Sequence, residues 1–167
     1  MTTSHAPKCR IERLRPVDWA RLKRLRIAAL TDTPDAFGAT VASAQARSPQ
    51  QWREQVQSLP TFVAIINDND VGLTRGAPHD KDPHSAMLIS MWVAPEARGL
   101  GAGERLVETT AKWARSHGYA RLMLDVTDDN APAIALYARL NFQATGETGS
   151  LPPPRTHIRE HRRALDL

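Results

Sequence analysis

The sequence predicts a single α/β domain, and three observations lead to this prediction. The chain has 167 residues, the length of one ordinary domain, and contains no internal repeat. Apolar runs typical of strands alternate with segments whose apolar residues recur at helical spacing. One strand-like run, residues 87–93, leads through a glycine-rich loop into a helix. We therefore expect one domain over residues 1–167, with a flexible N-terminus at 1–8 and a Pro-rich connector to the last strand at 151–155.

Strands are expected where apolar residues alternate with polar ones or run together between turn residues. These segments are 10–15, 62–66, 71–75, 87–93, 121–126, a strand that begins at Phe142 and is broken by Gly146 and Gly149, and 157–167. Helices are expected at 18–30, from Ser48 onward, from about 104 to 118 and at 130–140, with Ser48 and Asn130 as N-caps. Residues 31–40 and 76–83 are rich in turn residues and are expected to be irregular. The last strand interleaves Arg, His and Glu, which suits the edge of a sheet.

The composition excludes several classes of protein. Apolar residues make up 41% and charged residues 24%, which is typical of a folded globular chain. No apolar run approaches the roughly 20 residues of a membrane span, and the N-terminus lacks a basic-then-apolar signal pattern. Cys9 is the only cysteine, so no internal disulfide can form. We therefore expect a cytoplasmic protein without a membrane partner.

The chain is basic, with a formal net charge of +4. A basic protein can bind nucleic acid, or equally an anionic cofactor. The positive side chains are spread along the chain without a block of five or six like charges, so we interpret them as a solvated basic surface.

Three glycines at alternate positions, Gly99, Gly101 and Gly103, precede a helix that starts near Glu104. Without Cβ atoms they let the backbone turn sharply and let a ligand lie against it. The free N–H groups and the positive dipole end of the helix lie at this loop, an arrangement that binds phosphate. The loop lacks the Gly-Lys-Ser/Thr of a Walker A motif. A dinucleotide fingerprint would need a third glycine at Glu104, but Asp125 could be its acidic partner, so this alternative stays open.

The segment Arg98-x-x-Gly101-x-Gly103, directly after a strand that ends Val-x-Pro, resembles the acetyl-CoA pyrophosphate loop of the GNAT-superfamily N-acetyltransferases. A later segment resembles the helix Asn-x-x-Ala-x-x-Leu-Tyr-x-x-x-Gly-Phe that lines the pantetheine arm in this superfamily. The matching residues are Asn130, Ala133, Leu136, Tyr137 and Phe142. Asn141 replaces the usual glycine, and because Asn tolerates the left-handed conformation we expect the turn to be kept. The resemblance runs from about residue 10 to residue 142.

The resemblance, to the bacterial type of this superfamily, implies both a fold and an activity. The fold would be α/β (α+β), a single GNAT-like domain with a central mixed, mostly antiparallel twisted sheet of about six to seven strands flanked by about four helices. The activity would be that of an acyltransferase, an N-acetyltransferase that moves an acetyl group from acetyl-CoA, its cosubstrate, to a primary amine of a small molecule or peptide by direct attack. These motifs do not predict which amine is the acceptor. A homodimer is left open.

The resemblance also assigns residues. Tyr137 would be the catalytic acid that protonates the departing CoA thiolate. The cofactor-binding residues would be Trp92, Val93, Arg98, Gly99, Leu100, Gly101, Ala102, Gly103, Glu104 and Asn130. The general base stays open among Asp35, His84, Asp125 and Glu160, and an amine that is already neutral would need none.

A non-catalytic CoA-binding or nucleic-acid-binding module is the alternative function, and the presence of Tyr137 favours the enzyme. The six histidines include no His-x-x-x-His pair on a predicted helix and no His/Cys cluster, so we expect no metal. For the acceptor we hypothesise that the irregular loop at 31–40 surrounds a small cationic amine. In this hypothesis Asp35 attracts the charge and Phe37 covers the carbon chain.

Overall fold

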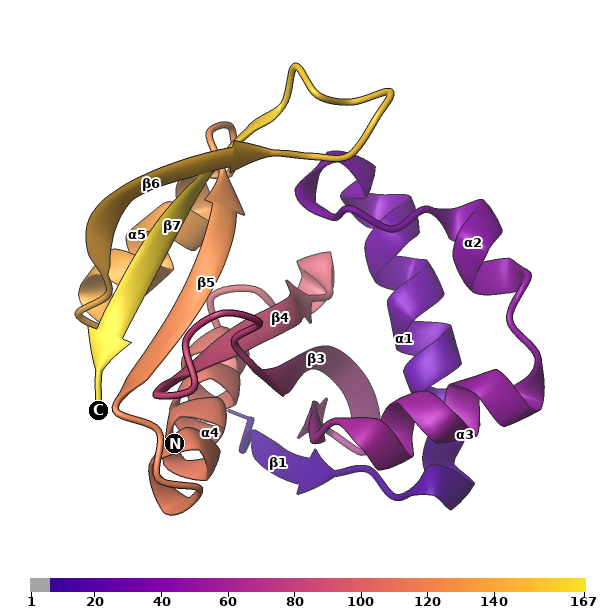
Figure 1. The fold of residues 1–167 in the computed structure, drawn as a ribbon. Coiled ribbons are helices and arrows are strands. Elements are labelled where there is room, and N and C mark those ends of the chain that lie inside the picture. The colour runs from indigo at the N-terminus through magenta and orange to yellow at the C-terminus, as the bar shows by residue number, and fades with distance from the viewer. Residues whose placement is uncertain (1–6) are drawn as a thin grey trace, which may run out of the picture.

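Seven strands form one mixed sheet in the computed structural model, which describes residues 7–167 (Figure 1). The strands are β1 (Arg10–Arg13), β2 (Thr61–Ile66), β3 (Asn69–Pro78), β4 (Ser85–Val93), β5 (Arg121–Thr127), β6 (Gln143–Ser150) and β7 (Arg159–Asp166). Their order in the sheet is β1-β2-β3-β4-β5-β7-β6. Every neighbouring pair is antiparallel except β4 and β5, which are parallel. The expected mixed, mostly antiparallel sheet is confirmed. Of the expected flexible N-terminus at 1–8, residues 1–6 lie outside the described residues.

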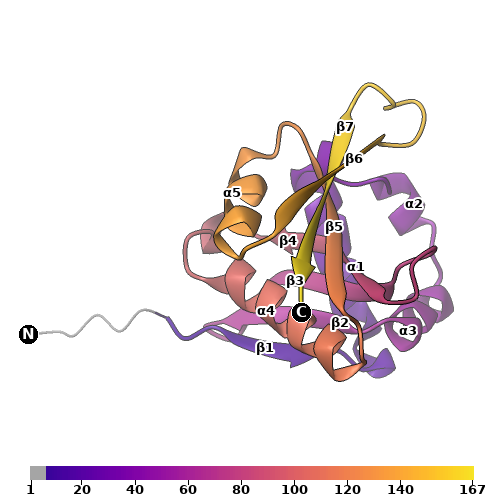
Figure 2. The same ribbon diagram turned by 60° about the vertical axis from the view of Figure 1, so that its left-hand side comes forward.

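Five α-helices within residues 7–167 cover the two faces of the sheet. They are α1 (Trp19–Asp32), α2 (Val41–Gln45), α3 (Pro49–Ser58), α4 (Ala102–Ser116) and α5 (Ala131–Arg139). Figure 2 shows α1 to α3 on one face and α4 and α5 on the other. All expected helices form, and α2 is additional, because its five residues are too few to show a helical period. Within residues 7–167 no helix is both long enough and apolar enough to span a bilayer.

The core is built around β2, whose six residues are all buried. Alternate side chains of a strand point to opposite faces, so its continuous apolar run serves two layers. Val63 and Ile65 pack with the residues of α1 and α3, whereas Phe62, Ala64 and Ile66 pack toward α4. Both faces of the sheet are therefore covered at its centre.

The helix α4 buries the face that the sequence pattern predicts. Its buried residues after the first position are Leu106, Val107, Thr110, Ala111 and Ala114. The helix begins at Ala102, two residues earlier than expected, and Gly118 follows its end with a φ of 79°. That positive φ suits glycine and ends the helix.

Two expectations about the C-terminal strands are wrong. β7 is not an edge strand, because it pairs with β5 on one side and β6 on the other. Its charged residues find partners inside the sheet, as Arg162 does with Asp125 on β5. β6 forms the edge of the sheet on this side, with β1 at the other edge, and is exposed along its whole length. It continues through both glycines, because Gly146 is absorbed in a shift in register between Ala144 and Thr148 and Gly149 pairs regularly with Glu160.

The hairpin β2–β3 forms where the Asn-Asp turn predicts it, with φ of 50° at Asn67 and 62° at Asp68. β3 is longer than expected and includes Gly76, which the sequence had suggested to be part of a loop. A Cβ at Gly76 would lie 2.5 Å from the ring of Trp113, so this glycine is required by the packing of α4 on the sheet. The loop between β3 and β4 therefore covers only residues 79–84.

β4 and β5 run side by side for only three residues. Their register pairs Ser85, Ala86 and Met87 with Arg121, Leu122 and Met123. Beyond Met87 the two strands separate, as Figure 1 shows. A bulge in β4 accompanies the separation, since two residues, Ser90 and Met91, stand opposite one residue of β3, and Ser90 has a φ of 58°. Because a bulge bends its strand, the sheet opens into a wedge at this point.

Candidate active site

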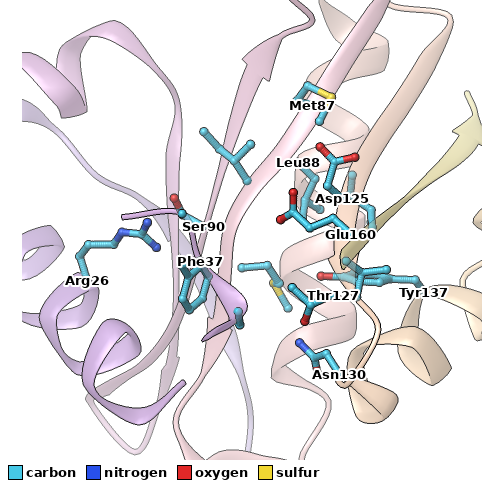
Figure 3. Close-up of a pocket in the computed structure, with 16 residues that line it drawn as sticks. Arg26, Phe37, Met87, Leu88, Ser90, Asp125, Thr127, Asn130, Tyr137 and Glu160 are labelled. Atoms are coloured by element: carbon cyan, nitrogen blue, oxygen red, sulfur yellow. The ribbon is translucent and has the colours of Figure 1, made fainter. Parts of the chain in front are cut away.

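The wedge between β4 and β5 holds a cavity of about 300 Å³. Its walls come from both halves of the sheet and from the segment after α1 (Figure 3). The polar and aromatic side chains of interest in the wall are Arg26, Phe37, Asp125, Thr127, Asn130, Tyr137 and Glu160. A concave site with few polar groups among apolar ones is typical of a small-molecule site.

The glycine loop stands at the N-terminus of α4 in the conformation that the sequence predicts. Gly99 has a φ of 79° and Gly101 a φ of 86°, and a Cβ on either would meet no atom within 4 Å. Arg105 has the first backbone N–H group that is hydrogen-bonded within the helix, and it donates to Gly101 O (3.2 Å). The preceding N–H groups, of Ala102, Gly103 and Glu104, have no intrahelical acceptor. Open space and free donors therefore meet at this loop, which fits a phosphate group.

Gly103 differs from the other two glycines, because it lies in close packing. A Cβ at this position would lie 3.2 Å from the side chain of Leu136 and 3.3 Å from that of Met91. Gly103 thus lets α4 approach α5 and β4. Leu100, in contrast, is 44% exposed at the tip of the loop.

A carboxylate that the sequence analysis missed ties the loop to β4 and α1. Asp32, the last residue of α1, accepts hydrogen bonds from Trp92 Nε1 (3.0 Å) and Arg98 Nη2 (2.6 Å). The hydrogen bond from Trp92, followed by the contact with Arg98, lowers the pKa of the Asp32 carboxyl. Arg98 Nε also donates to Val93 O (3.0 Å). The Arg98 side chain is therefore engaged in holding the start of the loop against β4.

The edge of β4 that faces β5 is free of strand pairing beyond Met87. Trp92 and Val93 lie on this part of β4 and pair only with β3, at Leu73 and Gly72. Backbone polar groups that lack a neighbouring strand require another partner. An extended amide-containing ligand could pair with such an edge as an additional strand does.

The second predicted motif, on α5, also faces the cavity. Asn130 caps the helix, since its Oδ1 accepts from Ala133 N–H (3.3 Å). Tyr137 is 5% exposed, packs its ring on Phe142, and directs its hydroxyl toward the cavity (Figure 3). Burial raises the pKa of the Tyr137 phenol, which keeps its proton in place. Asn141 has a φ of 69°, so the expected left-handed turn is confirmed.

Two of the four candidate bases line the cavity. Asp125 is held by Arg162 through two hydrogen bonds, from Nε (3.0 Å) and Nη2 (3.1 Å). Glu160 stands on β7 opposite Thr127 of β5, and burial, followed by the charge of Asp125, raises the pKa of its carboxyl. A carboxylate with a raised pKa is a better proton acceptor near neutral pH.

The other two candidates lie elsewhere. His84 belongs to the loop between β3 and β4 and is not part of the cavity wall. The carboxylate of Asp35 is 73% exposed and lies 3.7 Å from Arg155, whereas its neighbours Phe37 and Gly38 do line the cavity. The loop after α1 therefore forms one wall as hypothesised, but the carboxylates of the cavity are those of Asp125 and Glu160.

The loop between β6 and β7 fastens this wall to the other half of the sheet. Arg155 donates from Nη1 to Pro34 O (2.6 Å) and from Nη2 to Gly38 O (3.1 Å). These contacts join segments more than 100 residues apart in the chain and complete the enclosure of the cavity.

Residues 22–142 match the acetyltransferase (GNAT) family. The chain belongs to this family. The dinucleotide-binding alternative is wrong, because that fold has a mostly parallel sheet and this GNAT protein pairs only β4 and β5 in parallel.

Known proteins agree with this assignment. The streptothricin acetyltransferase of Streptomyces lavendulae is 35% identical over 91 residues, 54% of this chain and 48% of that protein. A GNAT-family acetyltransferase from Streptococcus pneumoniae superimposes with a TM-score of 0.79 at 19% identity, over 96% of this chain and 99% of that chain. The yncA protein of Salmonella typhimurium, solved with its cofactor acetyl-CoA, gives a TM-score of 0.76 at 19% identity, over 96% and 94% of the two chains. The chain spans about half or less of the length of the curated relatives it matches.

Within the part of this GNAT protein that the structure describes, no group of three or more His, Cys, Asp or Glu side chains is arranged to hold a metal ion.

Replacing Asp32 by Asn should lower the free energy of unfolding at neutral pH by about 1–3 kcal/mol, because an amide cannot replace a charged acceptor for Trp92 and Arg98. The folded-state pKa of Asp32 is lowered. Its stabilisation is therefore fully present above the unfolded-state pKa of about 3.9 and is lost as the pH falls through the folded-state value. In urea unfolding, the difference between wild type and variant should shrink between about pH 5 and pH 2.

Asp35→Asn is the matched control, because the carboxylate of Asp35 is 73% exposed. This variant should change the stability by less than about 0.5 kcal/mol. Equal losses in the two variants, or an Asp32→Asn loss that does not change with pH, would contradict the role of Asp32.

Proposed function

We propose that this GNAT protein transfers the acetyl group of acetyl-CoA to a primary amine of a small molecule or peptide. The observation that carries the proposal is the wedge between β4 and β5. It connects free N–H groups suited to a phosphate with a cavity that holds a proton donor, Tyr137, and a proton acceptor, Glu160. Membership of the acetyltransferase family supports it, and so does the acetyl-CoA bound in the structurally similar yncA protein.

The residues along the wedge fit the parts of CoA in order. The N–H groups of the loop and first turn would bind the pyrophosphate, through Arg98, Gly99, Leu100, Gly101, Ala102, Gly103 and Glu104. At the free edge of β4 near Trp92, Val93 would pair with the pantetheine amides, because the alternation that directs Ala94 N–H to Val71 O also directs the backbone groups of Trp92 to β3. Val93 would contribute its N–H, because its carbonyl oxygen accepts from Arg98. Asn130 would contact the same arm, and its amide nitrogen points toward the cavity (Figure 3).

Bound acetyl-CoA supplies an activated acetyl carbon, to which the amine nitrogen forms a C–N bond while the C–S bond breaks and the thiol is released. Tyr137 holds a proton at its phenol oxygen and donates it toward the departing sulfur. Glu160 accepts a proton from the incoming ammonium group and so frees its lone pair for attack. The second proton, which the nitrogen loses as the amide forms, restores the phenol of Tyr137. Burial disfavours the charged form of each side chain, so it keeps the phenol of Tyr137 protonated and raises the proton affinity of the Glu160 carboxylate.

Nucleic-acid binding, the alternative from the basic first helix, gains no support from its arginines. Arg21 pairs with Asp70 (2.8 Å) and Glu12 (2.7 Å), and Arg24 pairs with Asp70 (3.1 Å). These carboxylates neutralise much of the positive charge that a phosphate backbone would require.

We also propose that the protein works in the cytoplasm of a bacterium. The buried and free Cys9 agrees with a reducing compartment. The bacterial relatives support a bacterial source. A homodimer stays a prediction, which light scattering after size-exclusion chromatography would test.

Acetyl-CoA at about 100 times its dissociation constant should stabilise the wild type by roughly 2.7 kcal/mol. The Gly101→Val variant should lose this stabilisation, because a side chain would occupy the space where the pyrophosphate meets the backbone. Gly146→Val is the matched control. Gly146 has the same φ of 86° and the same open surroundings, but it lies on β6. Calorimetric binding of acetyl-CoA by Gly101→Val with near-normal affinity would overturn the assignment of the loop.

Tyr137→Phe should lower the turnover about 10²- to 10⁴-fold and leave acetyl-CoA affinity nearly unchanged, because only the proton donor is removed. The assay is thiol release from acetyl-CoA with a panel of primary amines, which also tests the proposed activity itself. Tyr119→Phe removes the only other phenol of the chain, which packs on Trp113 away from the cavity. Equal turnover in the two variants would reduce Tyr137 to a packing residue.

Glu160→Gln should lower kcat/KM and change its pH profile. In the wild type the rate should fall as the pH decreases through the raised pKa of Glu160, since a protonated carboxyl cannot accept a proton. This fall should occur at a higher pH than the roughly 4.3 of an ordinary glutamate. The acidic limb should be absent in Glu160→Gln and preserved in Glu54→Gln, whose side chain is exposed on α3. An unchanged acidic limb in Glu160→Gln would show that another group accepts the proton.

A further inference from the structure

Arg26 of α1 is a cation in the wall of the cavity without a counter-ion. Its guanidinium points toward the cavity beside Ser90 and Phe37 (Figure 3). The Nη1 atom is buried and has no hydrogen-bond partner among residues 7–167. The guanidinium carbon lies 4.7 Å from the centre of the Phe37 ring. Stacking on a ring uses the flat face of the guanidinium and leaves its in-plane N–H groups free.

Two further arginines raise the positive potential at this end. Arg75 is 8% exposed and donates only to neutral oxygens, Thr61 Oγ1 (3.1 Å) and Gln55 O (2.6 Å). In the described part of the chain, neither Arg26, Arg47 nor Arg75 pairs with a carboxylate. Burial, followed by the charges of Arg75 and Arg47, lowers the pKa of Arg26 to about 10. An anion at this end of the cavity would offset the unfavourable free energy of burying the positive charge of Arg26.

The opposite wall of the cavity carries negatively charged side chains. Asp125 and Glu160 face the cavity from β5 and β7 (Figure 3). Arg162 forms an ion pair with Asp125, whereas Glu160 has no ion pair within residues 7–167. Apolar side chains also line the cavity, with Phe37 beside Arg26 and Met87 and Leu88 near Asp125 (Figure 3). The cavity thus presents a cationic end and an anionic end, with apolar side chains beside each of them.

We propose that the acceptor amine also carries a carboxylate, so that its amino group lies at Glu160 and its carboxylate at Arg26. This inference rests on the proposed acetyl transfer. The carbon chain between the two groups would cover Phe37. A cavity of about 300 Å³ accommodates one amino-acid-sized molecule, at the lower end of the range for ligand sites. The acceptor class is therefore amino acids, in place of simple alkylamines or polyamines.

Matched pairs of acceptors test the proposal. Each pair compares an amino acid with the amine that lacks its carboxylate: leucine with 3-methylbutylamine, and 6-aminohexanoate with pentylamine. At least one amino acid should exceed its partner in kcat/KM by about 10- to 100-fold, the effect of one charged hydrogen-bonded contact. Amines that react as well as their amino acids in both pairs would overturn the proposal.

Variants of Arg26 localise the preference. Arg26→Met should abolish it, and Arg26→Lys should keep part of it, because a positive charge remains. Arg24→Met is the matched control on the same helix, since Arg24 is 69% exposed and pairs with Asp70. It should keep the full preference. A preference that survives in a folded Arg26→Met variant would overturn the assignment, and Arg26→Lys decides the matter if Arg26→Met does not fold.

Failure of the activity and failure of the inference give different results. If neither class of acceptor is acetylated although acetyl-CoA binds, the proposed function fails. Calorimetric titration of leucine and 6-aminohexanoate into the protein saturated with CoA then reads the Arg26 site directly. Binding of either probe that is lost in Arg26→Met supports the carboxylate site, and no binding of either probe to the wild type overturns it.

Discussion

The separation of β4 from β5 after three residue pairs is the constraint on which the rest of the site depends. In a strand in the middle of a sheet, the backbone N–H and C=O groups of both edges are normally hydrogen-bonded to the neighbouring strands, so none remain for a ligand. Here β4 keeps β3 on one side, while the bulge at Ser90 turns its other edge toward open space. The same divergence makes room for the cavity and directs the end of β4 at the N-terminus of α4. The pairing site for a cofactor and the space for an acceptor thus have one geometric origin.

An open wedge weakens a sheet, and this protein holds its two halves together with side chains. Asp32 joins α1 to β4 and to the glycine loop through Trp92 and Arg98. Arg155 joins the β6–β7 loop to the segment after α1 through backbone carbonyls at Pro34 and Gly38. Only the Arg155 contacts span the opening, whereas Asp32 and Arg98 brace the β4 side of it, where Arg98 also bonds Val93 O. The Arg155 contacts fix the walls of the cavity relative to each other, which a site that must orient two substrates requires.

What could be predicted from the sequence was decided by local backbone geometry. The glycine loop, the Asn130 cap and the left-handed Asn141 depend on residues adjacent in the chain, so their types reveal their conformations. The fold class followed from the alternation of strand and helix patterns. The position of β7 inside the sheet and the role of Asp32 could not be predicted, because they depend on contacts between residues far apart in the chain. Equally, no spacing rule could separate Glu160 from the other candidate carboxylates, since only the register of β5 and β7 places it in the cavity.

Burial raises the pKa of both proposed proton-transfer groups, Tyr137 and Glu160. For a phenol and a carboxyl alike, desolvation favours the neutral form and raises the pKa. The pKa of a phenol already lies far above neutral pH, so Tyr137 carries its proton throughout the physiological range and burial strengthens its hold on that proton. Glu160 begins far below neutral pH, so the same effect moves it toward the range in which it can accept and release a proton. Asp125 faces the same cavity, but two hydrogen bonds from Arg162 hold its carboxylate in place. The structure thereby distinguishes two neighbouring carboxylates by their partners, because Glu160 has no ion pair within residues 7–167.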